Sequence, residues 1–399
     1  MMEEDKRTFG QRFQAWFGLG ALMFGTFCGA NMASGVYAAN YIVTFGGGWA
    51  FVWLGMFFVA LSFFTSTGLN FARAYKVGNY KDFYVALWGA NKPTSNAVFR
   101  KGVTVFFDVF TLCSGVINVS ATIALFSELM NKLFNVPVFW ARAGAVLLFA
   151  ILTMYGAAFL RKFNTLMTVS LLVCMVVILV AVCGVRGDVL LSRIGNFNVG
   201  LDWSGDPLKA HFLMFTAYCF NISHWGGTLS TYSDQIHDGK DALGSGLTIA
   251  ALVCVLFALT GAIVLPFMPE VLGGTPILQI CQENLSPILT GVYWVVVIFS
   301  VVSTAPTFTF NVTKRWSAVW KSDKVKERTK FFVIAISFLL VCWLLSSVGL
   351  VAIVKKGYTT MGKVAVWAIA IPLVVSIPRV IKKDRADKAA ALEASAEQK

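Results

Sequence analysis

Two runs of glycine and small polar residues interrupt hydrophobic stretches that would otherwise cross a membrane as single helices. The first extends from Gly25 to Gly35 and the second from Phe220 to Gly227. A bilayer provides no water to bond free N–H and C=O groups, so non-helical backbone at this depth survives only where it lines an enclosed cavity. The freed groups can bind a solute or an ion. Breaks at corresponding places in two halves of a chain therefore indicate the binding site of a transporter.

Polar residues at helical spacing line three of the other apolar stretches. Residues three and four apart share one face of a helix, and polar faces in lipid turn toward the interior of the bundle. The sets are Asp108, Thr111, Gly115, Asn118 and Thr122 in the third stretch, Ser300, Ser303, Thr304, Thr307 and Asn311 in the eighth, and Ser62, Ser66 and Asn70 in the second. The third stretch of each half thus carries a polar face, and the first carries a break.

The elements that must position these residues are membrane-spanning helices. Of the 399 residues, 57% are hydrophobic and 13% are charged, whereas soluble domains are about a quarter charged. Apolar stretches of about 20 residues recur along the whole chain: 13–36, 47–72, 102–131, 139–160, 164–186, 207–236, 243–268, 288–313, 330–351 and 361–381. They predict an all-α membrane protein of ten transmembrane helices, a 5+5 inverted repeat in which helices 1 and 6 are broken.

The same pattern divides the chain into a cytoplasmic N-terminus (1–12), a ten-helix transporter domain (13–381) and a cytoplasmic tail (382–399). The two repeats cover about 13–186 and 207–381. Short helices that do not span the membrane are expected at 80–88 on the inner side and at 277–284 on the outer side. The eight cysteines lie almost all inside predicted spans without the spacing of metal ligands, so we expect neither disulfides nor a metal centre built from them.

The net charge of +13 is distributed as in a membrane protein. If the N-terminus is cytoplasmic, about three quarters of the 33 Lys and Arg residues fall in inner segments. Positive charge is enriched in cytoplasmic loops, and an even number of spans places both termini in the cytoplasm. The basic character therefore indicates topology and contact with membrane lipid rather than nucleic-acid binding. We expect a multi-pass protein of the cell membrane, specifically the bacterial cytoplasmic membrane.

Three segments of the N-terminal half carry a resemblance to a known family. They are Gly29-Ala30-Asn31-Met32-Ala33-Ser34-Gly35 with the Gly46-Gly47-Gly48 turn, the run from Tyr75 to Gly89, and Phe107-Asp108-Val109-Phe110. These segments resemble the YkvI-like amino-acid permeases, a family of the amino acid–polyamine–organocation (APC) superfamily with the leucine-transporter fold. Where that family usually has an acidic residue soon after the Ser-Gly pair, this chain has Val36-Tyr37.

The resemblance implies a substrate site where the two broken segments cross near the bilayer midplane. Backbone N–H groups at the start of the outer half-helix would bind a carboxylate, and carbonyls of the second break would accept from an ammonium group. His224 could contact substrate or switch its charge, or be a structural histidine. Trp225 could gate the pocket or anchor at the interface. The candidate substrate-binding residues are Gly29, Ala30, Asn31, Ser34, Asn118, Phe220, Asn221, Ser223, His224 and Trp225.

The resemblance also implies an ion site. Hard cations take oxygen ligands, and the corresponding positions are the carbonyls of Gly25, Cys28 and Ser300 with the hydroxyls of Ser303 and Thr304. The alternative is that these hydroxyls bond back to their own helix. In a proton-coupled relative, Asp108 or His224 would carry the coupling proton. Asp108 could instead pair with Lys101 or Arg100, since it lies about 9 Å from the inner end of its helix.

These observations predict a secondary active transporter of a small zwitterionic solute, an amino acid or a related amine, that uses sodium and no other cofactor. The alternatives are a proton-coupled permease or exporter of the same fold, a channel or a membrane-embedded sensor. The chain has no Walker motif for a nucleotide-driven pump, and no spanning segment carries a catalytic constellation, so we do not expect an enzyme. The expected partners are the solute and membrane lipid, and the protein is expected to be a monomer or a homodimer.

Overall fold

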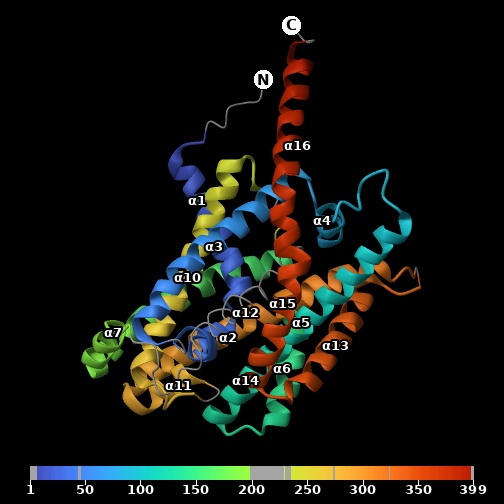
Figure 1. Ribbon diagram of the computed structural model, residues 1–399. Helices are drawn as coiled ribbons and strands as arrows, with labels where there is room; N and C mark the ends of the chain where they lie inside the picture. Colours follow the sequence, from blue (N-terminus) through green and yellow to red (C-terminus); the bar gives the residue numbers. More distant parts are fainter. Residues whose placement is uncertain are drawn as a thin grey trace.

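The computed structural model describes residues 7–43, 46–197, 229, 235–272, 275–322 and 324–396. Within these residues every regular element is a helix (Figure 1). The first half contains α1 (Phe9–Phe27), α2 (Ala30–Ala33), the π-helical turn η1 (Ala38–Ile42), α3 (Gly47–Ala74), α4 (Tyr80–Leu87), α5 (Ala97–Phe134), α6 (Val138–Thr153) and α7 (Ala157–Ile194).

The second half contains α10 (Gly239–Val264) with the short η4 (Leu265–Phe267), α11 (Pro276–Asn284), α12 (Pro287–Val319) and α13 (Glu327–Ser346). A last, almost continuous helix follows. It consists of α14 (Leu350–Ala352), η5 (Ile353–Tyr358), α15 (Thr359–Ala365), η6 (Val366–Ala370) and α16 (Ile371–Ala396). The two predicted short helices are α4 and α11, at the places that the sequence indicated.

Seven helices in the described part of the chain are long and apolar enough to cross a membrane. They correspond to the predicted spans 2, 3, 5, 7, 8, 9 and 10, and they make this a multi-pass membrane protein. The first predicted span is broken between α1 and α2, and the fourth is the 16-residue α6. The sixth predicted span lies outside the described residues, so the number of ten and the inverted repeat stay predictions.

Two of the long helices, α5 and α12, begin at side-chain caps. Asn96 and Ser286 accept hydrogen bonds from backbone N–H groups in the first turns of α5 and α12, which satisfies donors that a helix leaves free. Asn135 ends α5 in the left-handed conformation, with φ of 55°, where a short polar side chain is favoured over a bulky one. The long helices of the core therefore have defined registers.

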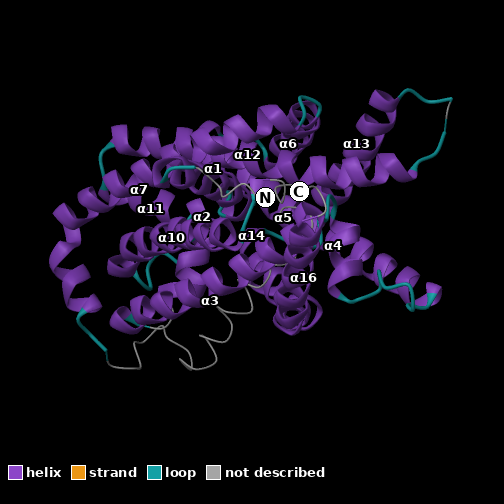
Figure 2. Ribbon diagram, turned by 90° about the horizontal axis from the view of Figure 1, so that it is seen from above, coloured by secondary structure: helices purple, strands orange, loops and turns teal. Residues whose placement is uncertain are grey.

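The packing brings the two halves of the chain together. Helix α3 packs along α10, α1 contacts both α10 and α7, and α12 contacts both α5 and α7. Seen from above, α3 and α10 lie on one flank of the bundle, and α6 and α13 lie on the other (Figure 2). The start of α1 and the end of α16 lie at the same end of the molecule, opposite α11 and α14 (Figure 1). We call these the α16 end and the α11 end.

Candidate functional site

The first predicted span is interrupted twice. Helix α1 ends at Phe27, Cys28 leaves helical geometry at φ of −103° and ψ of 50°, and α2 begins at Ala30. Two residues after the end of α2, Gly35 takes φ of +81°, a conformation that favours glycine because it has no Cβ. A helix end leaves its last carbonyls without partners in the helix. The carbonyls of Gly25 and Cys28 lie at the end of α1, where this applies.

The first interruption rests directly on the polar face of α12. A Cβ placed on Gly29 would lie 2.2 Å from the Oγ1 atom of Thr304, so only glycine permits this approach. Ser300, Ser303 and Thr304 are all buried. The structure therefore brings Gly29, a predicted substrate-binding residue, against Thr304, a predicted ion ligand 275 positions away in the chain.

The hydroxyls of this face are bonded back to their own helix. Ser303 Oγ and Thr304 Oγ1 each donate to the Ser300 carbonyl at 2.9 Å, as the alternative interpretation of these residues expects. A hydroxyl that donates once keeps lone pairs with which it can accept or bind a cation. Ser300 Oγ is buried and has no hydrogen-bond partner among the residues that the structure describes.

Helix α7 supplies a residue that sequence reasoning missed. Asn164 packs against Gly25, where an added Cβ would lie 2.8 Å from the Asn164 Cβ. Its side-chain oxygen Oδ1 is buried and has no hydrogen-bond partner in the described part of the chain. Thr168, one turn on, donates to the carbonyls of Ala21 and Asn164 at 3.0 and 2.8 Å, which ties α7 to α1. The only signal in the sequence was an asparagine at the start of an otherwise apolar stretch.

The second interruption is held by one bond of its own and by contacts from two other segments. The Ser34 hydroxyl accepts from the Val36 N–H at 3.3 Å, and the Ser34 carbonyl accepts from the Ile277 N–H of α11 at 3.2 Å. Tyr293 of α12 donates to the Ala33 carbonyl at 3.1 Å. The predicted substrate residue Ser34 thus has a clear structural role in the turn, while α11 covers this turn at the α11 end.

Asn118 of α5 lies in the same interior region and is buried. Its Oδ1 accepts a hydrogen bond of 3.3 Å from Tyr358 in η5. Tyr41, in the π-helical turn after the break, donates to the Val354 carbonyl at 2.9 Å and lies 3.2 Å from Thr359 Oγ1. The Tyr41 contacts connect the segment after the break to the π-helical start of the last helix, and the Tyr358 bond connects that start to α5. π-Helical turns inside α-helices are frequent at functional sites.

The other half of the predicted substrate site cannot be compared. The break from 220 to 227, with Phe220, Asn221, Ser223, His224 and Trp225, lies outside the described residues. Ala30 and Asn31 are described as backbone of α2 only. Their roles stay predictions.

The predicted partners of Asp108 were wrong. Asp108 pairs with neither Lys101 nor Arg100 but with Arg315 of α12, at 2.8 Å between Nη2 and Oδ2 and 3.1 Å between Nε and Oδ1. Tyr80 of α4 also donates to Asp108. Burial, with Asp108 beside it, raises the pKa of the Tyr80 hydroxyl, which keeps it a donor. Arg100 instead donates to the Ala90 carbonyl at 2.8 Å, because on the helix it lies about 12 Å from Asp108.

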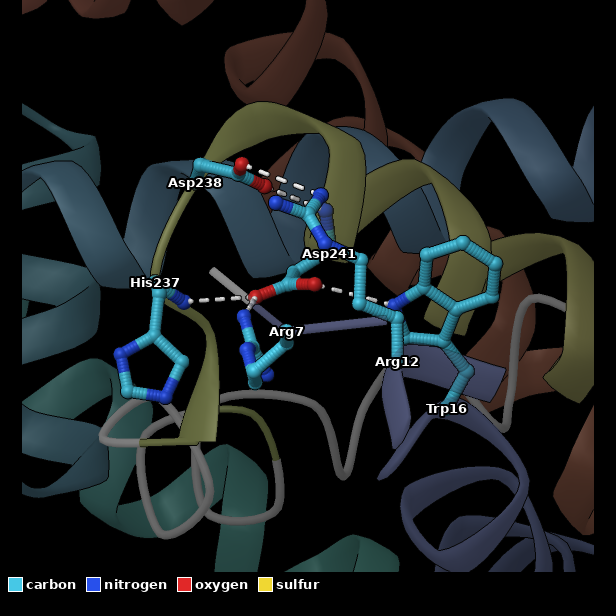
Figure 3. A network of polar contacts seen from close by, with 6 residues as sticks. All are labelled: Arg7, Arg12, Trp16, His237, Asp238 and Asp241. Carbon is cyan, nitrogen blue, oxygen red and sulfur yellow. Dashed lines mark hydrogen bonds and ion pairs between the residues drawn. The ribbon is translucent and has the colours of Figure 1, made fainter. Parts of the chain in front are cut away.

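A second charged network closes the α16 end of the bundle (Figure 3). The Asp241 carboxylate accepts from Arg7 Nη2 at 2.5 Å, from Trp16 Nε1 at 3.1 Å and from the His237 N–H at 3.2 Å. Arg12 pairs with Asp238 at 3.4 Å. Asp238 caps α10 by accepting from the Asp241 N–H at 2.7 Å. The network joins the first residues of α1 to the first turn of α10, and the Asp-x-x-Asp cap was its only signal in the sequence.

Comparison with known proteins identifies the fold. No protein-family model matches the chain, and no curated protein matches it in sequence. Among solved structures, MhsT in complex with L-phenylalanine superposes with a TM-score of 0.62 at 15% identity, covering 88% of this chain and 87% of MhsT. A Na⁺-coupled sialic acid symporter in a substrate-bound outward-open state gives 0.59 at 13% identity, covering 90% and 78%. A manganese transporter of Eremococcus coleocola gives 0.58 at 14% identity, covering 92% and 80%. All are transporters with the leucine-transporter fold, and at these identities the likeness establishes the fold alone.

Proposed function

We propose that this chain is a secondary active transporter that moves a small zwitterionic solute, an amino acid or a related amine, across the cytoplasmic membrane by alternating access, coupled to sodium. The observation that carries the proposal is the interrupted first span packed on the polar face of α12. It occurs within a fold shared with a Na⁺-coupled symporter and with a protein that binds L-phenylalanine. The relation to the YkvI-like permeases remains part of the proposal.

The charge of the substrate follows from what surrounds the break. The stretches 13–36, 102–131 and 288–313 contain no Lys or Arg, so no side chain there could neutralise a net anion. Backbone N–H groups of Gly29, Ala30 and Asn31 precede or begin α2 and lack partners within it. They suit a carboxylate. The carbonyls of Phe220, Asn221 and Ser223 suit an ammonium group, and the two together favour a zwitterion.

Sodium is supported by a buried oxygen atom beside the predicted ligands. These ligands are the carbonyls of Gly25, Cys28 and Ser300 with the hydroxyls of Ser303 and Thr304. To these we add Asn164 Oδ1, because buried polar atoms are nearly always bonded and this one, beside Gly25, has no partner among the described residues. An ion bound there would satisfy it.

The proposal is tested by thermal unfolding of the purified protein against a panel of amino acids and amines, in sodium and in choline buffers. A ligand at 100 times its Kd stabilises by about 2.7 kcal/mol, which raises Tm by a few degrees. We expect at least one zwitterion to do so in sodium only, and to accumulate in proteoliposomes with an inward sodium gradient. Saturable accumulation excludes a channel, and the absence of any stabilising zwitterion would contradict the proposal.

Proton coupling through Asp108 is the competing mechanism. The bidentate pair with Arg315 and the bond from Tyr80 make Asp108 part of a structural network between α5, α12 and α4. We therefore expect Asp108→Asn to lower Tm while solute uptake still depends on sodium. Uptake driven by a proton gradient in the parent, and lost in Asp108→Asn at unchanged folding, would establish the competing mechanism instead.

A further inference from the structure

A cavity of about 540 Å³ lies between the ends of α6 and α13, away from the break in the first span. Its walls include the apolar side chains of Ile151, Met154 and Phe332. Ile151 and Phe332 are 45% and 42% exposed. Since α6 and α13 are packed together on one flank of a membrane protein (Figure 2), these side chains face the surroundings of the bundle.

The other walls of this cavity carry positive charge. Lys326 and Arg328 line it together with Tyr155. Neither cation forms an ion pair or a side-chain hydrogen bond with another described residue. Other arginines of the protein do have such partners. Arg73 pairs with Asp384, for example, and Arg379 donates to the Leu87 carbonyl.

The acidic residues nearest in sequence do not neutralise the positive charge of the cavity wall within the described chain. Glu327 is exposed in the first turn of α13 and is not part of the cavity wall. Asp323 lies outside the described residues. The cavity therefore combines apolar side chains from α6 and α13 with two cations at the start of α13. An anionic lipid has the matching arrangement, a charged head group joined to an apolar chain. Basic pockets between helices on the cytoplasmic side of membrane proteins bind lipid head groups.

We propose that the cavity between α6 and α13 is a binding site for an anionic phospholipid. The phosphate lies between Lys326 and Arg328, and an acyl chain follows Ile151 and Phe332. Arginine and lysine both bind phosphate, the first as a fork and the second as a point charge. The site goes beyond the transport function, because none of its residues belongs to the substrate or ion site.

The test is lipid binding to the purified protein, measured by native mass spectrometry with dioleoylphosphatidylglycerol or dioleoylphosphatidylcholine as the probe. We expect the anionic lipid to be retained in preference to the zwitterionic one. The double variant Lys326→Gln/Arg328→Gln should lose affinity for the anionic lipid roughly 30-fold, because each basic residue contributes about fivefold near a membrane surface. Ile151→Ser should weaken retention of the lipid while both cations remain.

The matched control is Lys321→Gln/Lys324→Gln, which removes the same charge from the segment just before α13, from residues outside the cavity wall. It should bind the anionic lipid as the parent does. An equal loss of affinity for the anionic lipid in both double variants would show that surface charge alone attracts the lipid, and it would overturn the proposal. Equal retention of the two lipids would also overturn it. So would displacement of the lipid by an equal concentration of glycerol 3-phosphate, which would assign the site to a soluble phosphate.

Discussion

Thr304 shows how one side chain can serve both packing and ion binding. Its hydroxyl donates to the Ser300 carbonyl, and the same atom lies against the backbone of Gly29. The sequence predicted the polar face of α12 from spacing alone. It did not predict how closely the break would approach that face, because such a distance depends on the packing of helices far apart in the chain.

The close contact at Gly29 gives a prediction with a matched control. Gly29→Ala should lower Tm and abolish solute binding, since the new Cβ would overlap Thr304 Oγ1 at 2.2 Å and overpacking costs about 1–3 kcal/mol. Gly18→Ala, in the same span, meets no atom within 4 Å. It should be neutral or slightly stabilising, because alanine favours the helix by about 0.5–1 kcal/mol. Thermal unfolding compares the two, and equal effects would show that Gly29 is not constrained by Thr304.

The ion site gives a second prediction at this scale. Ser303→Ala/Thr304→Ala should weaken sodium binding by at least about 30-fold, because two ligands are lost at about 1–3 kcal/mol each. Apparent solute affinity should fall with it by linkage. The measurement is solute binding against sodium concentration in both proteins. Thr309→Ala, also buried in α12 and bonded to its own helix, is the control. Sodium-independent binding in the parent would reject the site.

At the scale of elements, the start of α1 and the start of α10 are held together by Asp241. Asp241→Asn keeps the volume but removes the charge that pairs with Arg7. Breaking a largely buried pair costs about 1–3 kcal/mol, so the α16 end should open more often. Alkylation of the fully buried Cys28, mapped by mass spectrometry, should then become faster. Asp387→Asn, which breaks the exposed pair with Lys383, should leave the rate unchanged. An unchanged rate in Asp241→Asn as well would show that the network does not restrain this end.

Elements were more predictable from sequence than the contacts between them. Hydrophobic periodicity located α3, α5, α10, α12 and α13, and turn residues located α4 and α11. Asp108 is the opposite case. Its charged neighbours along the helix were visible in the sequence, whereas Arg315 is 207 positions away and only the packing of α5 on α12 brings it close.

At the scale of the whole molecule, the distribution of charge predicts which end faces the cytoplasm. The α16 end carries the start of α1 and the end of α16 (Figure 1). We expect this end to be cytoplasmic under the positive-inside rule. In a cysteine-free background, Asn196→Cys should react with an impermeant maleimide from outside intact cells. Asp323→Cys should react only after the cells are opened. The reverse pattern would invert the topology.

The last helix has a mechanical consequence. Beyond Pro378, α16 continues without interruption to Ala396, and its base is fixed to the end of α3 by the Arg73–Asp384 ion pair at 2.6 Å. From Lys382 onward it projects about 21 Å at 1.5 Å per residue. A rocking of only about 10° in the membrane would displace its tip by about 4 Å. The tail is thus a rigid extension of the last span that converts a small rotation into a larger displacement. A spectroscopic probe near its tip would report movements too small to follow inside the bundle.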